Sequence, residues 1–109
     1  KFGFIEAAAG WVPFLIHIVR RLLKDKFRFG SSAELFREYR IYVACEADED
    51  LPYLTQYIGE DHLLTGSDYG HNDPAEQTQL VATMKAREDM PAGLVQKILC
   101  ENPRKFYGI

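Results

Sequence analysis

One stretch decides the fold of this 109-residue chain: Leu63-Leu64-Thr65-Gly66-Ser67-Asp68-Tyr69-Gly70-His71. Its first five residues are apolar or small and predict a buried strand, which a carboxylate and an imidazole follow at once. Residues 2–7 and 41–46 are similar runs, aromatic or β-branched in character. Because all three runs are almost continuously apolar rather than alternating, they are typical of strands that are buried on both faces of a parallel sheet.

Helical patterns separate these predicted strands. Apolar residues recur at helical spacing over residues 12–27, with Pro13 in the first turn. Shorter helices are expected over 33–39 with Ser32 as cap, from Asp50 to Gly59, from Asp73 to about Glu88, from Pro91 to about Glu101, and as a last turn from Asn102 to Gly108. The order of strands and crossover helices predicts an α/β fold, with residues 1–109 as one domain.

Composition excludes several classes of protein. The chain is 47% hydrophobic with a formal net charge of −3, which is ordinary for a folded protein and unlike a basic nucleic-acid binder. The excess of bases in residues 1–40 could indicate a polyanion partner, but Arg20, Arg21 and Lys24 are expected simply to form the wet face of a helix. The longest apolar run, residues 11–16, is far shorter than the ~20 residues of a membrane span. Two cysteines without a paired pattern indicate reduced thiols and a cytoplasmic protein.

The ends of the predicted strands are where chemistry is expected, because parallel α/β folds place their sites there. The candidates are Glu6 with Trp11, an acidic run from Glu46 to Asp50, and Asp68 with His71. A carboxylate at a strand tip can ligate a divalent metal and accept a proton. Aspartate also commonly forms turns or caps helices, and a loop histidine is often only polar surface. The acidic run lacks calcium-loop spacing and is expected to be solvated.

Several motifs together resemble one family. They are Lys1-Phe2-Gly3-Phe4-Ile5-Glu6-Ala7 with Gly10-Trp11-Val12-Pro13, Ile41-Tyr42-Val43, the stretch 63–71, and Lys97-Ile98-Leu99 with Glu101-Asn102-Pro103-Arg104-Lys105-Phe106-Tyr107-Gly108. They resemble the carboxyl-terminal third of the amidohydrolase superfamily, in the branch of the aminocarboxymuconate-semialdehyde decarboxylase-like metal-dependent hydrolases. The resemblance implies a TIM (β/α)₈ barrel, of which this chain would supply about strands six to eight, and one divalent metal, often zinc.

The resemblance also implies roles for single residues. Asp68 would end the eighth strand as metal ligand and catalytic proton-transfer group, while Glu6, Trp11 and His71 would bind a small-molecule substrate. Gly70 stands where relatives commonly have proline. The family's remaining ligands, a His-x-His pair on the first strand and a histidine on the fifth, match none of the histidines of this chain.

The implied activity is hydrolysis of a C–N or C–O bond by metal-activated water. A non-oxidative decarboxylase of the same fold and a non-enzymatic α/β scaffold module are the alternatives. A whole barrel takes about 250 residues. The chain, which begins with Lys1, is therefore expected to be a fragment that is inactive alone. Its open sheet edges would be covered by another copy or by the missing part of the barrel.

Overall fold

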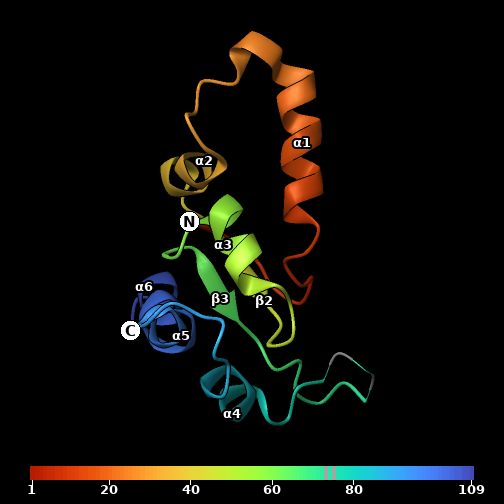
Figure 1. The fold of residues 1–109 in the computed structure, drawn as a ribbon, viewed down its shortest axis with the longest axis vertical. Coiled ribbons are helices and arrows are strands. Elements are labelled where there is room, and N and C mark those ends of the chain that lie inside the picture. The colour runs from red at the N-terminus through yellow and green to blue at the C-terminus, as the bar shows by residue number, and fades with distance from the viewer. Residues whose placement is uncertain (73, 75) are drawn as a thin grey trace.

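The computed structural model describes residues 1–72, 74 and 76–109 and places a three-stranded sheet at the centre of the chain (Figure 1). Strands β1 (Phe2–Phe4), β2 (Ile41–Cys45) and β3 (Leu63–Thr65) are parallel and lie in the order β1-β2-β3. The three predicted strands and the α/β class are thus confirmed. The outer strands are shorter than predicted, since β1 ends at Phe4 and β3 at Thr65.

Helices connect the strands. Helix α1 (Val12–Leu23), a 3₁₀ turn (Lys24–Lys26) and α2 (Ser32–Tyr39) lead from β1 to β2, and α3 (Leu51–Ile58) leads from β2 to β3. Asp50 caps α3 as predicted, since its carboxylate accepts a hydrogen bond from the Tyr53 N–H at 3.2 Å. The cap of α2 is Ser31 rather than Ser32, because Ser31 has the extended backbone that lets a hydroxyl turn back to the Glu34 N–H.

The helix predicted from Asp73 begins later, and α4 spans Leu80–Lys85. Asp73, the predicted cap, lies outside the described residues, as does Ala75. The reason for the late start is tertiary. The Glu76 carboxylate accepts from the Gly70 N–H at 3.3 Å, and the Gln77 side chain accepts from the Ala47 N–H at 2.9 Å. These side chains tie the segment to the ends of the strands instead of opening a helix.

The chain ends in a helical segment that contains one wide turn. Helix α5 (Leu94–Gln96) begins three residues after the predicted start, continues through a π-helical turn (Lys97–Glu101) and passes into α6 (Asn102–Tyr107). Gly108 ends it at φ 78°, as predicted. The Asn102 side chain is buried, and its amide donates to the carbonyl oxygens of Glu60 at 2.7 Å and Leu63 at 2.8 Å. Asn102 therefore fixes the last helix to the start of β3.

The two faces of the sheet bury different side chains. The larger core joins one face to the helices, and its members include Val12, Ile16, Phe36, Val43, Leu51, Ile58, Leu63, Met84 and Ile98. On the other face Tyr42, Ala44 and Leu64 are buried with Phe106 of α6. Gly3 makes that contact possible, because a Cβ there would lie 2.6 Å from the Phe106 ring. The last helix thus closes one end of the second face.

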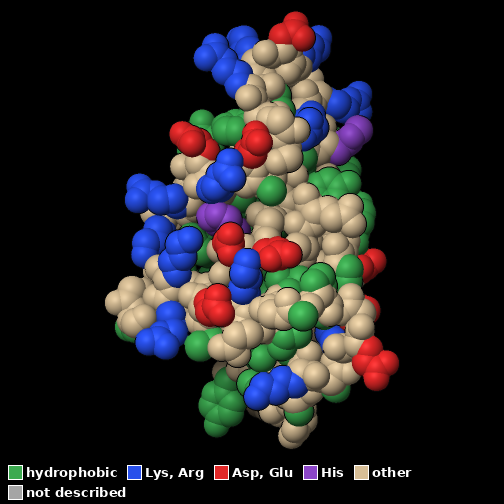
Figure 2. Space-filling model, turned by 60° about the vertical axis from the view of Figure 1, so that its left-hand side comes forward, with side chains coloured by type: hydrophobic (Ala, Val, Ile, Leu, Met, Phe, Trp, Pro, Cys, Tyr) green, Lys and Arg blue, Asp and Glu red, His purple; other side chains and the backbone are tan. Residues whose placement is uncertain are grey.

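The segment from α1 to α2 exposes many basic side chains, together with apolar ones such as Phe14 and Leu22. Lysine and arginine side chains gather at the end of the molecule that this segment forms (Figure 2). Arg20, Arg21 and Lys24 are exposed there, which confirms that these bases form a solvated helix face. Among the described residues, we find no helix with the length and apolar character that crossing a bilayer requires.

Candidate metal centre

The carboxyl ends of the three strands meet around a small hollow. Because parallel strands end at one edge of a sheet, the residues that follow β1, β2 and β3 converge there. The cavity measures about 50 Å³. It is lined by Glu6, Ala8, Ala44, Cys45, Glu46, Gly66 and Asp68. Two of the predicted site residues, Glu6 and Asp68, therefore face one cavity although they follow the two different edge strands.

The backbone around these two carboxylates is unusual. Glu6 has φ 60°, Ala8 has φ 51° and Asp68 has φ 52°, all in the left-handed region. Non-glycine residues enter this region at a cost of about 1–2 kcal/mol each. The departure from extended geometry at Glu6 also explains why β1 stops at Phe4, well before the predicted end at Ala7. Three of the five described non-glycine residues with a positive φ, Glu6, Ala8 and Asp68, thus lie at this edge of the sheet.

Asp68 holds an oxygen without a hydrogen bond. Its Oδ1 is buried and receives no hydrogen bond from any described residue. His71 Nδ1 lies 2.8 Å from that oxygen, which is an ion-pair distance. The Asp68 side chain is 16% exposed and the His71 side chain is 58% exposed. A buried carboxylate oxygen of this kind is costly unless a further group binds it.

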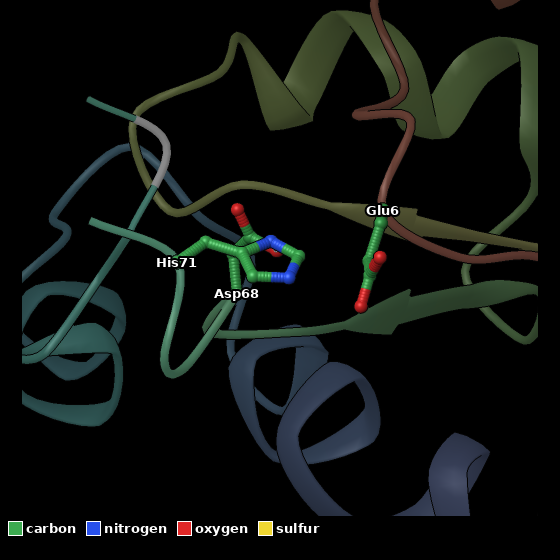
Figure 3. A group of neighbouring side chains, drawn as sticks. All are labelled: Glu6, Asp68 and His71. Atoms are coloured by element: carbon green, nitrogen blue, oxygen red, sulfur yellow. The ribbon is translucent and has the colours of Figure 1, made fainter. Parts of the chain in front are cut away.

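Glu6 completes a cluster with these two residues (Figure 3). One ligand atom from each of Glu6, Asp68 and His71 lies within 4.8 Å of the other two. Carboxylate oxygen and imidazole nitrogen are ligands for divalent metals such as zinc, and catalytic zinc typically takes three protein ligands. The donor set and the orphaned oxygen therefore fit a divalent cation. Sequence reasoning assigned metal binding to Asp68 alone, and the left-handed turn at Glu6 is the feature it could not foresee.

Two nearby residues, Cys45 and Trp11, have structural contacts instead. Cys45 is a buried thiol that donates to the Leu64 carbonyl oxygen at 3.1 Å, and burial raises the pKa of Cys45 to about 12. Cys45 is therefore protonated at neutral pH. The Trp11 indole N–H donates to the Ala8 carbonyl oxygen at 2.9 Å, and its ring packs edge-on against Phe4. Trp11 thus holds the loop after β1, and its predicted contact with substrate stays a prediction.

The turn that presents His71 depends on Gly70. Gly70 has φ 91°, which an L side chain rarely adopts and which the ring of proline forbids. Its N–H also donates to Glu76, a bond that proline could not make. The glycine found at this position is therefore a requirement of this loop conformation.

We expected the acidic run after β2 to be solvated, and for Glu49 this expectation is wrong. The Glu49 carboxylate is half-buried and accepts hydrogen bonds from the N–H groups of Ala9, Gly10 and Glu46. No periodicity or spacing singles out Glu49 among its acidic neighbours. The only signal is indirect, since the small residues at 7–10 permit a close approach of another chain segment.

Comparisons with known proteins identify the family and the fold. A family model described as amidohydrolase matches residues 6–109. Among solved structures, an amidohydrolase from Mycobacterium avium subsp. paratuberculosis K-10 is similar, with a TM-score of 0.69 and 24% sequence identity over 98% of this chain. The alignment covers 27% of that longer chain, so the present residues span about a quarter of its length, as a segment of a TIM barrel would. No curated protein matches.

At 24% identity the structural likeness shows the fold alone, whereas the family model extends over nearly all of the sequence. The parallel sheet, the acidic strand ends and the family match lead to one conclusion. The chain belongs to the amidohydrolase family.

Proposed function

We propose that these residues form the carboxyl-terminal wall of the active site of a metal-dependent hydrolase that acts on C–N or C–O bonds of a small molecule. The observation that supports this most directly is the buried Asp68 oxygen, which has no hydrogen bond among the described residues and faces Glu6 and His71. Asp68, with Glu6 and His71 beside it, would hold a divalent cation, zinc foremost. A divalent cation supplies Lewis acidity, which polarises a carbonyl group and makes water acidic near neutral pH.

The residues of the chain have distinct tasks in this proposal. Asp68 accepts the proton that water loses as its oxygen bonds to the substrate carbonyl carbon, and returns it to the leaving nitrogen or oxygen as that bond breaks. The exposed imidazole of His71 lies at the rim, where it can donate a hydrogen bond to a polar group of the substrate. Trp11 holds the loop after β1, from which it would also shape the substrate pocket.

The test uses the full-length protein that contains this chain, purified, stripped of metal and reconstituted with zinc. Wild-type protein is expected to hydrolyse members of a panel of lactones, esters and amides. Asp68→Ala is expected to lose at least tenfold in zinc affinity and to lose turnover. Glu88→Gln, which removes an exposed carboxylate, is the control and should change neither. Unchanged metal content and turnover in Asp68→Ala would contradict the proposal.

Decarboxylation is the alternative that the same residues allow, with Asp68 delivering a proton to carbon as carbon dioxide leaves. A panel of aromatic carboxylates, assayed beside the esters and amides, separates the two reactions. Release of carbon dioxide without hydrolysis would favour the decarboxylase. If the protein neither hydrolyses nor decarboxylates any member of the panels and binds no zinc, the result would favour a non-enzymatic scaffold.

We also propose that the 109 residues do not turn over substrate by themselves, because β1 and β3 are edges of a three-stranded sheet and supply only part of a barrel. Another copy or the remainder of the barrel would cover those edges. Sedimentation of the isolated chain tests whether the edges need such a cover, and a stable, cooperatively folding monomer would contradict that part of the proposal.

The free thiols of Cys45 and Cys100 favour the reducing cytoplasm as the location of the protein.

A further inference from the structure

A single carboxylate joins the loops that follow β1 and β2. Glu49 Oε1 accepts from the N–H groups of Ala9 at 3.0 Å and Gly10 at 2.7 Å. Glu49 Oε2 accepts from the N–H groups of Ala9 at 3.1 Å and Glu46 at 2.9 Å. Hydrogen bonds between a carboxylate and backbone N–H groups are charge-assisted and stronger than neutral ones. This set of contacts, which we call the Glu49 latch, binds the two loops together.

The loop after β1 has the small residues that the latch requires. A Cβ on Gly10 would lie 3.3 Å from Glu49 Oε1, which is tighter than most contacts of this kind. Ala9, whose N–H group donates to this carboxylate, is fully buried in the core. The backbone therefore approaches Glu49 as closely as it can, and a larger side chain at position 10 would push the two loops apart.

Glu49 is itself fixed from the other side. The Arg87 guanidinium donates to the backbone carbonyl oxygens of Ala47 and Glu49, each at 2.7 Å. Arg87 is held in turn by Asp89, whose carboxylate raises the pKa of the guanidinium. Gln77 also accepts from the Ala47 N–H at 2.9 Å. The loop that carries Glu49 is thus anchored by two separate segments, so the latch is a fixed point for the loop after β1.

We propose that Glu49 is a positioning residue that holds the loop after β1 so that the Glu6 carboxylate faces Asp68 and His71. Glu6 and Ala8 keep left-handed backbones within three residues of the latched N–H groups. Such conformations persist only where surrounding contacts over-determine them, and the latch, together with the Trp11 hydrogen bond to Ala8, supplies such contacts here. The effect on the metal centre rests on the function proposed above, whereas the latch itself does not.

Amide hydrogen exchange of the full-length protein tests the latch directly. Glu49→Gln keeps the size of the side chain but turns one acceptor oxygen into an NH₂ group that faces backbone donors. The N–H groups of Ala9 and Gly10 are expected to exchange at least tenfold faster in this variant. Glu88→Gln, the matched change at an exposed carboxylate beside Arg87, should leave both rates within twofold. Unchanged exchange in Glu49→Gln would overturn the latch.

Zinc affinity, measured by competition with a chromophoric chelator, tests the effect on the metal centre. Glu49→Gln is expected to weaken zinc binding about tenfold, the lower end of what groups that orient metal ligands contribute. Gly10→Ala, which crowds Oε1 without removing the charge, should act in the same direction by two- to threefold and covers the case in which Glu49→Gln folds poorly. Glu49→Asp retains both acceptor oxygens and should recover part of the affinity.

A double-mutant comparison separates positioning from a general loss of structure. If Glu49 acts through Glu6, then Glu49→Gln should weaken zinc binding less than twofold in a Glu6→Ala background. A tenfold loss in both backgrounds would show that Glu49 acts by another route and would overturn the proposal. If wild-type protein binds no zinc, the proposed function fails and the role of Glu49 at the metal centre fails with it. The exchange experiment would still decide whether the latch exists.

Discussion

Buried polar groups at the two ends of the three-stranded sheet differ in their hydrogen bonding. At the amino end, His62 Nδ1 pairs with the Ile41 carbonyl oxygen at 3.0 Å, and the Asn102 amide has two backbone acceptors. At the carboxyl end, the buried oxygen of Asp68 has no hydrogen bond among the described residues, and Asp68 and Glu6 adopt left-handed backbones. The amino end therefore satisfies its buried polar side chains with backbone partners, whereas at the carboxyl end a buried carboxylate oxygen has only the His71 imidazole, at 2.8 Å, beside it in the part of the chain that the structure describes.

This difference matches the general division of labour in parallel α/β barrels, where the amino face of the strands stabilises and the carboxyl face reacts. Proteins often give up stability at functional sites and recover it elsewhere. If that division holds here, substitutions at the amino end should cost much stability, and removing the Asp68 charge should cost almost none. The expected effects on stability can be ranked accordingly.

Asn102→Ala should give the largest loss of stability. The substitution leaves the buried carbonyl groups of Glu60 and Leu63 without their amide donor and should lower the free energy of unfolding by about 2–4 kcal/mol. Urea unfolding of the full-length protein measures this. Gln96→Ala, at an exposed amide of the same helical segment, is the control. A loss below about 1 kcal/mol would show that Asn102 contributes little to the stability of the amino end of the sheet.

Gly3→Ala should give the next largest loss. The new Cβ would lie 2.6 Å from the Phe106 ring, so the ring or the strand must move. Overpacking of this kind costs about 1–3 kcal/mol. Phe106→Leu should relieve the clash, so Gly3→Ala should cost less in that background. Additive losses in the double mutant would show that the Phe106 contact is not the cause.

His62 should make stability depend on pH. Burial lowers the pKa of His62 below its usual 6.5, which outweighs the raising effect of its bond to Ile41. Below pH 6.5 the unfolded chain therefore binds more protons than the folded one. The contribution of neutral His62 is complete above about pH 6.5 and is lost as the pH falls from there through the folded pKa.

One proton limits the size of this effect to a slope of about 1.4 kcal/mol per pH unit. Unfolding free energies measured from pH 7 down to 5 should show the slope in wild-type protein and in the exposed-histidine control His17→Gln. His62→Gln should flatten it. An equal slope in all three proteins would assign the pH dependence to other groups.

Much of the fold could be predicted because its signals are local. A continuous apolar run is enough to identify β2, and the Asp50 cap with Pro52 identifies α3. The start of α4 could not be predicted in the same way, because Glu76 bonds to the turn at Gly70 and Gln77 bonds to Ala47, which is distant in sequence. Local capping preferences give way where a side chain has a tertiary partner.

The candidate site was predictable only in part for a related reason. Asp68 stands at the tip of a recognisable strand, so its position follows from the pattern. Its approach to Glu6 depends on left-handed turns at both residues, and the latch depends on which of several adjacent carboxylates points inward. Neither feature leaves a periodic signal in the sequence, because each is decided by contacts between separate loops.

Asp68→Asn should give the smallest change in stability and is the sharpest test of the comparison. The buried Oδ1 receives no hydrogen bond among the described residues, so a neutral amide there gives up only the ion pair with the exposed His71 and relieves the cost of burying charge. Asparagine also tolerates the left-handed backbone at φ 52°. The free energy of unfolding in metal-free protein should therefore stay within about 1 kcal/mol of the wild-type value or exceed it. Zinc affinity should fall in the same variant, because an amide is a poorer ligand than a carboxylate. A loss of stability as large as that of Asn102→Ala would mean that Asp68 is part of the framework, and the two ends of the sheet would then no longer differ in kind.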